Sequence, residues 1–424
     1  MSSPAHMASF LSSTGTPAVR SAHPSWLAFW LVTAAIAIAA AASGTPSPLY
    51  VDYQAEWHFS ATTLTVVYAM YAGGVVLTLL FAGGLSDRVG RRPVLLSSVV
   101  GLMASLVVFL LARSVPWLLA ARLVQGLATG VFTSAAAASL TELHPRRDSR
   151  VAALVNSTST SVGIAAGAVG AGALAQWAPW PLETPYLVLV TLAAVLVAAI
   201  AMRVPETVAA DVTFSLATLI RPRRISVPRS IRRPFVVACL GVGAAWSVGG
   251  LYLGLGGSLA KDLLGIHNHL VAGVVILLVQ GIGGLSQLGL TKLSWRAASV
   301  VGCVALIVGM AVVAVSVAST NAPVFLFGDA VTGVGFGLVF MGGTRLVTQA
   351  APAEARGQVL AAYFVVAYLA ISVPVIGAGV VATALGLART FYVFATLMGL
   401  VSVITLISTL LSRTGESLTP AGHR

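Results

Sequence analysis

Twelve long apolar runs, separated by short polar connections, constrain this chain more than any other feature of its sequence. A membrane-spanning helix needs about 20 mostly apolar residues, and each run is long enough to supply one. The runs begin at Trp26, Leu64, Val94, Trp117, Val151, Tyr186, Phe235, Leu270, Ala297, Val324, Val359 and Phe391. They are too long and too uniformly apolar to be alternating barrel strands. The sequence therefore predicts an all-α integral membrane protein with twelve transmembrane helices.

The composition places the chain in the lipid bilayer. Only 8% of the 424 residues are charged and 58% are hydrophobic, whereas a typical soluble protein is about 25% charged. The net charge of +12 does not indicate a nucleic-acid partner, because no basic face with interleaved aromatic residues is present. Both cysteines, Cys239 and Cys303, lie inside apolar runs. Neither a disulfide framework nor a metal site is expected from them.

The basic residues predict the orientation in the membrane. With both termini in the cytoplasm, 19 of the 24 basic residues fall on the cytoplasmic side. The outer loops hold only Arg113, Lys261 and Arg389, and the runs themselves hold Arg122 and Arg345. This distribution obeys the positive-inside rule. We expect a multi-pass protein of the cell (inner, cytoplasmic) membrane with both termini cytoplasmic.

One long polar connection divides the chain into two halves. Between Arg203 and Arg233 it carries seven arginines against Glu206 and Asp211. The expected order is a disordered cytoplasmic tail (1–25), an N-terminal six-helix bundle (26–204), an Arg-rich cytoplasmic linker (205–234), a C-terminal six-helix bundle (235–411) and a cytoplasmic tail (412–424). The arginines favour a linker held at lipid headgroups, and a regulatory or partner-binding role is the alternative. The first run ends at Gly44 in a sequence similar to a signal peptide, but its length and the runs behind it favour a retained helix.

The two halves repeat each other at a shift of 207 residues. The shift carries Arg122, Gly126, Gly130, Pro145, Gly167, Gly170 and Gly172 onto Asp329, Gly333, Gly337, Pro352, Pro374, Gly377 and Gly379. Five of the seven pairs are identical, and in one pair an arginine is matched by an acid. The repeat predicts a duplicated helical unit, and paired halves suit alternation about a central site.

A charged hairpin joins the second and third runs. It reads Gly83-Gly-Leu-Ser-Asp-Arg-Val-Gly-Arg-Arg-Pro-Val-Leu. It resembles the loop signature of the major facilitator superfamily, Gly-x-Leu-x-Asp-Arg-x-Gly-Arg-Arg/Lys, and matches at Gly83, Leu85, Asp87, Arg88, Gly90, Arg91 and Arg92. The resemblance covers nearly the whole membrane region. It implies two pseudo-symmetric six-helix bundles and secondary active transport, with likeness to the bacterial drug/proton antiporters.

The resemblance also implies roles for the hairpin. In the family, the carboxylate at the position of Asp87 docks at the start of the eleventh helix, which lies near Arg356 and Gly357 in this chain. Arg91 then pairs with an acid at the inner end of the fourth helix, where Glu142 fits. We expect these contacts to latch the halves on the cytoplasmic side when the cavity opens outward. A solvated basic loop without a gating role is the alternative.

Arg122 lies inside the fourth run, where a charge costs about 2.5 kcal/mol or more on insertion. It should therefore face a water-filled cavity or a partner. Its segment is similar to a second superfamily signature, Arg-x-x-Gln-Gly with a further glycine four residues on, through Arg122, Gln125, Gly126 and Gly130. The similarity implies a part in proton coupling or in holding an anionic group. An arginine that bonds carbonyls and fixes helix packing is the alternative.

Asp329 is the only carboxylate lying well inside a run. It is our candidate proton carrier, because a carboxylate withdrawn from water can load and release a proton near neutral pH. Alternatively, it lies close enough to the outer interface to stay solvated. Spacing alone does not decide whether Arg122 and Asp329 meet.

Glycines at four-residue spacing predict close helix contacts. They are Gly126, Gly130, Gly163, Gly167, Gly333 and Gly337. The fifth run is also similar to the antiporter signature of the superfamily, Gly-x-x-x-Gly-Pro-x-x-Gly-Gly. However, Ala168 and Ala171 stand where the proline and the last glycine belong. This departure leaves the direction of transport open.

Polar and aromatic side chains within the runs are candidates to line a substrate cavity. They are Tyr68, Tyr71, Gln125, Asn156, Trp246, Tyr252, Gln280, Gln287, Tyr363 and Tyr368, and among them we favour Gln125, Trp246, Asn156, Tyr68 and Tyr363. For each residue taken alone, packing or an interfacial position is preferred over a role as a ligand. Few charges and many apolar walls suit an uncharged or lipophilic compound better than a phosphorylated sugar.

The sequence thus predicts proton-coupled export of a small organic compound, such as a drug or metabolite, by a monomer that needs no cofactor beyond the proton gradient. A proton symporter that imports a nutrient is the first alternative. A non-transporting receptor or assembly protein is the second. An enzyme is not expected, because the runs hold no His/Cys metal spacing, Ser/His pair or paired carboxylates. No Gly-x-x-x-x-Gly-Lys-Ser/Thr loop is present, so ATP-driven transport by this chain alone is excluded.

Overall fold

The computed structural model describes residues 25–82, 84–208, 226–265 and 268–412. These residues form helices and connections without a strand, and twelve of the helical stretches are long and apolar enough to cross a membrane. Each predicted run is found in one of them. The chain is therefore an all-α membrane protein with twelve spans.

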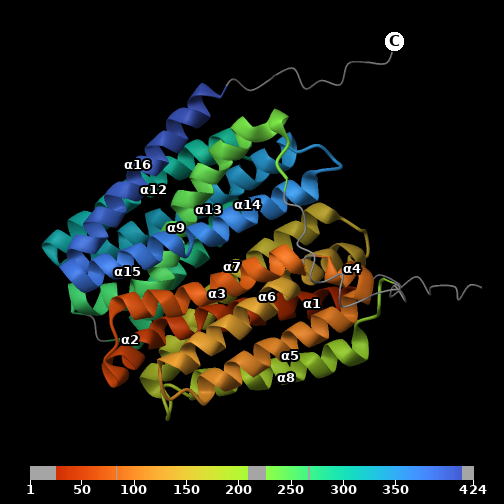
Figure 1. Cartoon of the computed structure of the whole chain (residues 1–424), viewed down its shortest axis with the longest axis horizontal. Helices are drawn as coiled ribbons and strands as arrows, with labels where there is room; N and C mark the ends of the chain where they lie inside the picture. Colours follow the sequence, from red (N-terminus) through yellow and green to blue (C-terminus); the bar gives the residue numbers. More distant parts are fainter. Residues whose placement is uncertain (1–24, 83, 209–225, 266–267, 413–424) are drawn as a thin grey trace, which may run out of the picture.

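In Figure 1 the helices run obliquely from lower left to upper right, and the N-terminal half, coloured red to yellow-green, lies below the C-terminal half. The first half comprises α1 (Trp26–Gly44), α2 (Pro46–Trp57), α3 (Ala61–Phe81), α4 (Leu85–Val89), α5 (Arg91–Leu110), α6 (Val115–Leu143), α7 (Ser149–Trp177) and α8 (Thr184–Arg203). The second comprises the 3₁₀ turn η3 (Arg229–Ile231), α9 (Arg232–Leu264), α10 (His269–Ile276), the π-helical turn η4 (Leu277–Gly281), α11 (Ile282–Gly289), α12 (Trp295–Ser319), α13 (Ala322–Ala350), α14 (Arg356–Ala370), α15 (Val373–Leu385) and α16 (Leu387–Leu411). We call the end of the bundle near α4 the hairpin end, and the end at which α2 stops the α2 end.

The repeat seen in the sequence extends to the helix boundaries. A shift of 207 residues carries α6 onto α13 from the first residue to the last, and both helices contain 29 residues. Each follows a polar N-cap residue, Ser114 or Asn321, and has proline at its second position. Arg122 and Asp329 are both the eighth residue of their helix. The two halves therefore place opposite charges at the same depth.

The first span is longer than the sequence predicts. The apolar run ends at Gly44, but the helix continues through Pro46 and Pro48 to Trp57, with Thr45 in a right-handed helical conformation (φ −54°, ψ −45°). Proline has no N–H, so Pro46 cannot bond the carbonyl of Ala42 four residues earlier. Such a kink is tolerated in a membrane only where neighbouring groups satisfy the freed carbonyl.

The glycines at four-residue spacing lie where helices approach each other closely. A Cβ atom at any of them would overlap a neighbouring helix. The neighbours are Tyr71 for Gly126, Thr78 for Gly130, Ala37 for Gly163, Ala41 for Gly167, Leu278 for Gly333 and Gly283 for Gly337. Small residues at such contacts let backbones pack in the absence of a hydrophobic driving force between helices in lipid.

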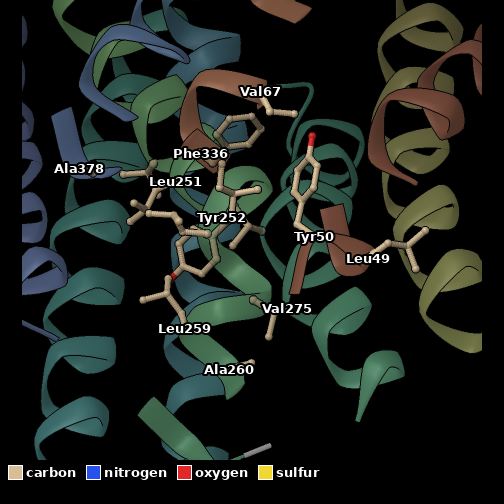
Figure 2. Packing of buried hydrophobic residues seen from close by; sticks show 14 of the residues in the cluster. Leu49, Tyr50, Val67, Leu251, Tyr252, Leu259, Ala260, Val275, Phe336 and Ala378 are labelled. Atoms are coloured by element: carbon tan, nitrogen blue, oxygen red, sulfur yellow. The ribbon is translucent and has the colours of Figure 1, made fainter. Parts of the chain in front are cut away.

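The two halves meet along a seam that holds the largest apolar cluster. In this seam α7 packs on α10, α3 on α14 and α15, and α2 on α9. Tyr50 and Val67 of the first half and Leu251, Tyr252 and Phe336 of the second belong to one buried cluster (Figure 2). The core is therefore shared by both halves.

The contact between α7 and α1 gives a test of the packing. We expect Gly167→Ala to lower the free energy of unfolding by about 1–3 kcal/mol, because the added methyl overlaps the backbone of Ala41. Gly170→Ala is the matched control on the same helix, where a Cβ meets nothing within 4 Å. Thermal unfolding in detergent measures both, and equal melting temperatures for the two variants would contradict the packing.

Candidate functional site

Two ionisable side chains are buried inside the bundle. Arg122 of α6 and Asp329 of α13 are both 0% exposed. No ion pair joins them among the described residues, and each is bonded within its own half. Because Asp329 is fully buried, the alternative in which it stays solvated is wrong for this structure. Arg122 and Asp329 form no ion pair in it.

Arg122 and Gln125 donate hydrogen bonds to backbone carbonyl groups at the kink of the first span. The Nη1 atom of Arg122 donates to the carbonyl of Ser43 (3.0 Å) and to Oε1 of Gln125 (2.7 Å). Nε2 of Gln125 donates to the carbonyl of Ala42 (2.8 Å), which is the carbonyl that Pro46 leaves unbonded. These bonds, with the hydrogen bond that Nε of Arg122 donates to the Tyr50 hydroxyl (2.6 Å), form what we call the polar clamp.

Aromatic rings surround the guanidinium of Arg122. Its central carbon lies 5.4–5.8 Å from the ring centroids of Tyr50, Tyr68, Tyr71 and Phe109. Cation–π contacts of this kind are worth about 0.5–2 kcal/mol each, depending on desolvation. The positive charge is thus stabilised by rings and by polar neutral groups, and Nη2 has no hydrogen-bond partner among the described residues.

Asp329 has a simpler environment. Its Oδ1 accepts a hydrogen bond from the hydroxyl of Tyr252 on α9 (2.6 Å), and its Oδ2 has no partner in the described part of the chain. Figure 2 shows Tyr50 and Tyr252 in the same cluster with their hydroxyls pointing in opposite directions. Each buried charge therefore holds a tyrosine from the first span of its own half.

The aromatic candidate cavity residues gather near the seam, where Trp246 and Tyr368 pack against the buried cluster that contains Tyr68. Tyr68 lies beside Arg122, as described above. Trp246 packs against Phe340 (ring centroids 5.4 Å apart) and Tyr368 (5.2 Å), and Phe340 also stacks on Tyr363 (6.5 Å). Of the remaining candidates, Asn156 is half-buried on α7, Gln280 is buried in η4 and Gln287 bonds Ser157.

The hairpin contains the ion pair that the resemblance implied. Nη2 of Arg91 lies 3.0 Å from Oε1 of Glu142, and Nη1 lies 2.6 Å from Oδ1 of Asp87. Leu85 packs against the apolar cluster of the first half, and Arg92 donates to the carbonyl of Ala201. In the same motif Arg88 is exposed and Gly83 lies outside the described residues.

The expected contact of Asp87 with the eleventh helix is absent from this structure. Asp87 is exposed and pairs with Arg91, and the main contacts of α4 are with α5 and α6 of its own half. Arg356 and Gly357 at the start of α14 are also exposed. The latch is expected for a cavity that opens outward and its release for one that opens inward, so the latch stays a prediction for a conformation other than this one.

Glu206, which the sequence analysis left in the linker, occupies a helix N-terminus instead. Its carboxylate accepts the backbone N–H groups of Arg91 (2.8 Å) and Arg92 (3.1 Å) at the start of α5, where the helix dipole favours an anion. It also accepts the N–H groups of Thr207 and Val208. Gly90 has φ +107°, and a Cβ there would overlap the carboxylate. An acid just after the sixth run is visible in the sequence, but only the fold brings it to α5.

A second acid is placed at a helix start at the hairpin end. Asp148 precedes α7 and accepts the backbone N–H groups of Val151 and Arg150. These two hydrogen bonds lower the pKa of its carboxyl. Asp148 therefore keeps its negative charge at neutral pH and caps α7.

No group of three or more potential metal ligands occurs within the described residues.

Residues 32–375 match the family model of the Major Facilitator Superfamily. The chain belongs to the major facilitator superfamily. It is a membrane transporter and not an enzyme. The geometry above therefore belongs to a superfamily member in which one half buries an arginine and the other half buries an aspartic acid at the equivalent position.

Curated relatives and solved structures agree with this family. The chain is 34% identical over 121 residues to the multidrug resistance protein MdtL of Shewanella sp. (strain ANA-3), a stretch covering 28% of this chain and 30% of the relative. The corresponding values for MdtL of Escherichia coli K12 are 31% over 117 residues, 27% and 30%. The chain thus matches about a third of the length of these relatives.

The fold is similar to that of solved transporters. A bacterial homologue of the human lysosomal transporter Spinster, inward-facing and unoccupied, aligns with TM-score 0.70 and 13% identity over 90% of this chain and 96% of its own. The nucleoside transporter NupG aligns with TM-score 0.71 and 12% identity over 90% and 99%. The human organic anion transporter MFSD10 aligns with TM-score 0.63 and 18% identity over 89% and 99%.

The polar clamp predicts a rescue. Gln125→Leu leaves the carbonyl of Ala42 without a donor and should lower the free energy of unfolding by about 1–3 kcal/mol. Adding Pro46→Ala supplies the missing N–H within the helix and should recover much of that loss. A double-mutant cycle of thermal unfolding in detergent measures the coupling. Purely additive effects of the two changes would contradict the clamp.

The contact of Glu206 with α5 predicts a change in local opening. Glu206→Ala leaves the N–H groups of Arg91 and Arg92 without their acceptor, so their hydrogen exchange should accelerate by about tenfold for each 1.4 kcal/mol lost. Hydrogen–deuterium exchange over residues 84–95 measures this. Glu354→Ala, at an exposed acid of the same end, is the control. Equal exchange in the two variants would show that Glu206 does not cap α5.

Proposed function

We propose that this chain exports a small organic compound, such as a drug or metabolite, in exchange for protons by alternating access. The observation that carries the proposal is the burial of Asp329 without a positively charged partner. Its carboxylate is fully buried, is bonded only to Tyr252 and has no cation among the described residues within ion-pair distance. A group in this position can serve as the proton carrier.

The reason is the cost of a buried charge. An ionised carboxylate without a compensating cation loses several kcal/mol of hydration free energy, of the order of 3–5 kcal/mol when a partner charge is missing. Binding a proton removes this cost. Arg122, in contrast, keeps its charge in an aromatic cage of neutral groups. In the proposed cycle the titratable charge belongs to one half and the permanent charge to the other.

The proposed substrate class rests on the aromatic side chains that gather near the seam. Tyr68 and Tyr71 of the first half and Trp246 and Tyr368 of the second present aromatic surface, and charged groups at this depth are few. Aromatic and apolar walls with a small number of polar groups suit a lipophilic compound. The name of the MdtL relatives, multidrug resistance protein, supports the same class.

We further propose that the hairpin end is cytoplasmic. Asp87, Arg88, Arg91 and Arg92 lie there, and the basic residues of the chain collect on that side in the even-span topology. Both termini are then cytoplasmic, in the cell (inner) membrane. We propose a monomer that uses the proton gradient and no cofactor, with nucleic acid playing no part.

A proton symporter that imports a nutrient is the second candidate. The specific observation in its favour is α7, in which Ala168 and Ala171 replace the proline and last glycine of the antiporter signature. The fold is also shared with a nucleoside transporter. The sign of the proton movement on addition of substrate separates the two candidates.

A transport assay tests the proposal. In proteoliposomes of the purified protein with a pH-sensitive dye inside, a panel of lipophilic compounds should include some that drive proton movement opposite to their own. Asp329→Asn should abolish this proton movement, because an amide cannot load a proton. Asp262→Asn, at an exposed carboxylate of α9, is the matched control and should couple normally.

Each failure has its own meaning. If no compound moves in either direction, the transport of such compounds is contradicted. If compounds move but Asp329→Asn couples normally, only the role of Asp329 is contradicted. Proton movement in the same direction as the compound would replace export by symport.

A further inference from the structure

One histidine ties the two halves together at the α2 end. His269 begins α10 in the second half, and its Nε2 lies 2.9 Å from Oδ1 of Asp52 on α2. Its backbone N–H donates to Oε1 of Gln176 on α7 (3.1 Å), and its Nδ1 lies 3.2 Å from the same oxygen. A single residue therefore bridges to two elements of the opposite half.

The geometry identifies the protonation state that satisfies these contacts. A backbone N–H can only donate, so the atom of Gln176 that it meets must be the amide oxygen. Both ring nitrogens of His269 then face oxygen acceptors, one of the amide and one of the carboxylate. Only the imidazolium carries a hydrogen on both nitrogens. The neutral ring would turn a lone pair toward one of the two oxygens.

A cavity gives this pair access from the α2 end. It has a volume of about 210 Å³ and is lined by Pro48, Val51, Asp52, Gly257, Lys261, Asn268, His269 and Ala272. Its ionisable groups are Asp52, Lys261 and His269. The carboxylate of Asp52 favours a proton on His269, whereas the ammonium of Lys261 repels the imidazolium. Gln176, the partner from α7, is neutral.

We propose that Asp52, Gln176 and His269 form a proton-operated latch that holds the halves together at the α2 end. Protonated His269 bonds both partners and keeps the end closed. Loss of the proton removes one bond and the ion pair, and the end opens more readily. The other polar contacts of this end, Thr62 with Thr383 and Ser258 with Gln54, are between neutral side chains and do not titrate.

The direction of the effect fits the proposed function, on which this role of the latch rests. The proposed orientation places the α2 end outside. A proton arriving from outside would then favour closure at that side, which is the step that returns a proton-driven exporter to its inward-facing state.

A distance measurement tests the latch without a substrate. Spin labels are placed at Arg113 and Ala318, two exposed positions at the α2 end of opposite halves, in a protein in which Cys239 and Cys303 are alanine. We expect the longer-distance population to grow by about fivefold between about pH 6 and pH 8.5, since a half-exposed ion pair worth up to about 1 kcal/mol changes a two-state equilibrium by that factor.

Two variants and one control decide the source of the pH dependence. His269→Gln and Asp52→Asn should each remove most of it, with the longer distance already populated at low pH. His58→Asn removes an exposed histidine of the same end and tolerates its left-handed backbone (φ 50°), so it should behave as the unmodified protein. If His269→Gln does not fold, Asp52→Asn makes the same test.

The outcomes separate cleanly. A pH-independent distance distribution in the unmodified protein overturns the latch, and so does a pH dependence that survives in the folded variants. Because the measurement needs no transported compound, a latch that works in a protein with no detectable transport would leave the latch standing and contradict only the proposed function.

Discussion

Backbone N–H and C=O groups in a membrane must be bonded within the protein, and at the kink of the first span the side chains of α6 meet this requirement. Pro46 frees the carbonyl of Ala42, and Gln125 and Arg122 of α6 supply the donors. The same bonds fix α2, which continues the span beyond the kink. Because α2 carries Tyr50 to the core and Asp52 to the seam, the polar clamp positions groups at both depths.

The two halves surround their buried ionisable side chain differently, although α6 in the first half and α13 in the second correspond residue for residue. Arg122 is surrounded by oxygen atoms that accept its hydrogen bonds and by aromatic rings, so its charge is compatible with burial. Asp329 has one tyrosine. In the proposed mechanism this inequality is what makes one half responsive to protons while the other is constant, and the shared apolar seam transmits the response.

Much of the architecture follows from the sequence because it depends on local pattern. The starts of the spans come from apolar length, the equivalence of Arg122 and Asp329 from the repeat, and the Arg91–Glu142 pair from the family motif. The first span is longer than its apolar run because Gln125, a residue distant in the sequence, supplies the hydrogen bond that Pro46 cannot donate. Without such a donor, a proline would be expected to end the helix. Glu206 at α5 and His269 at Asp52 were missed because only the fold joins them. The family motif implies a partner for Asp87 on the eleventh helix, but a motif does not specify the conformation in which that contact forms.

Alternating access, as proposed for this chain, requires the halves to separate at the α2 end. Thr62 of α3 and Thr383 of α15 have hydroxyl oxygens 2.9 Å apart across the seam, so cysteines there can form a disulfide. In a protein with Cys239 and Cys303 replaced, oxidation of Thr62→Cys/Thr383→Cys should stop transport in proteoliposomes, and a reductant should restore it. Undiminished transport by the fully cross-linked protein would contradict the account.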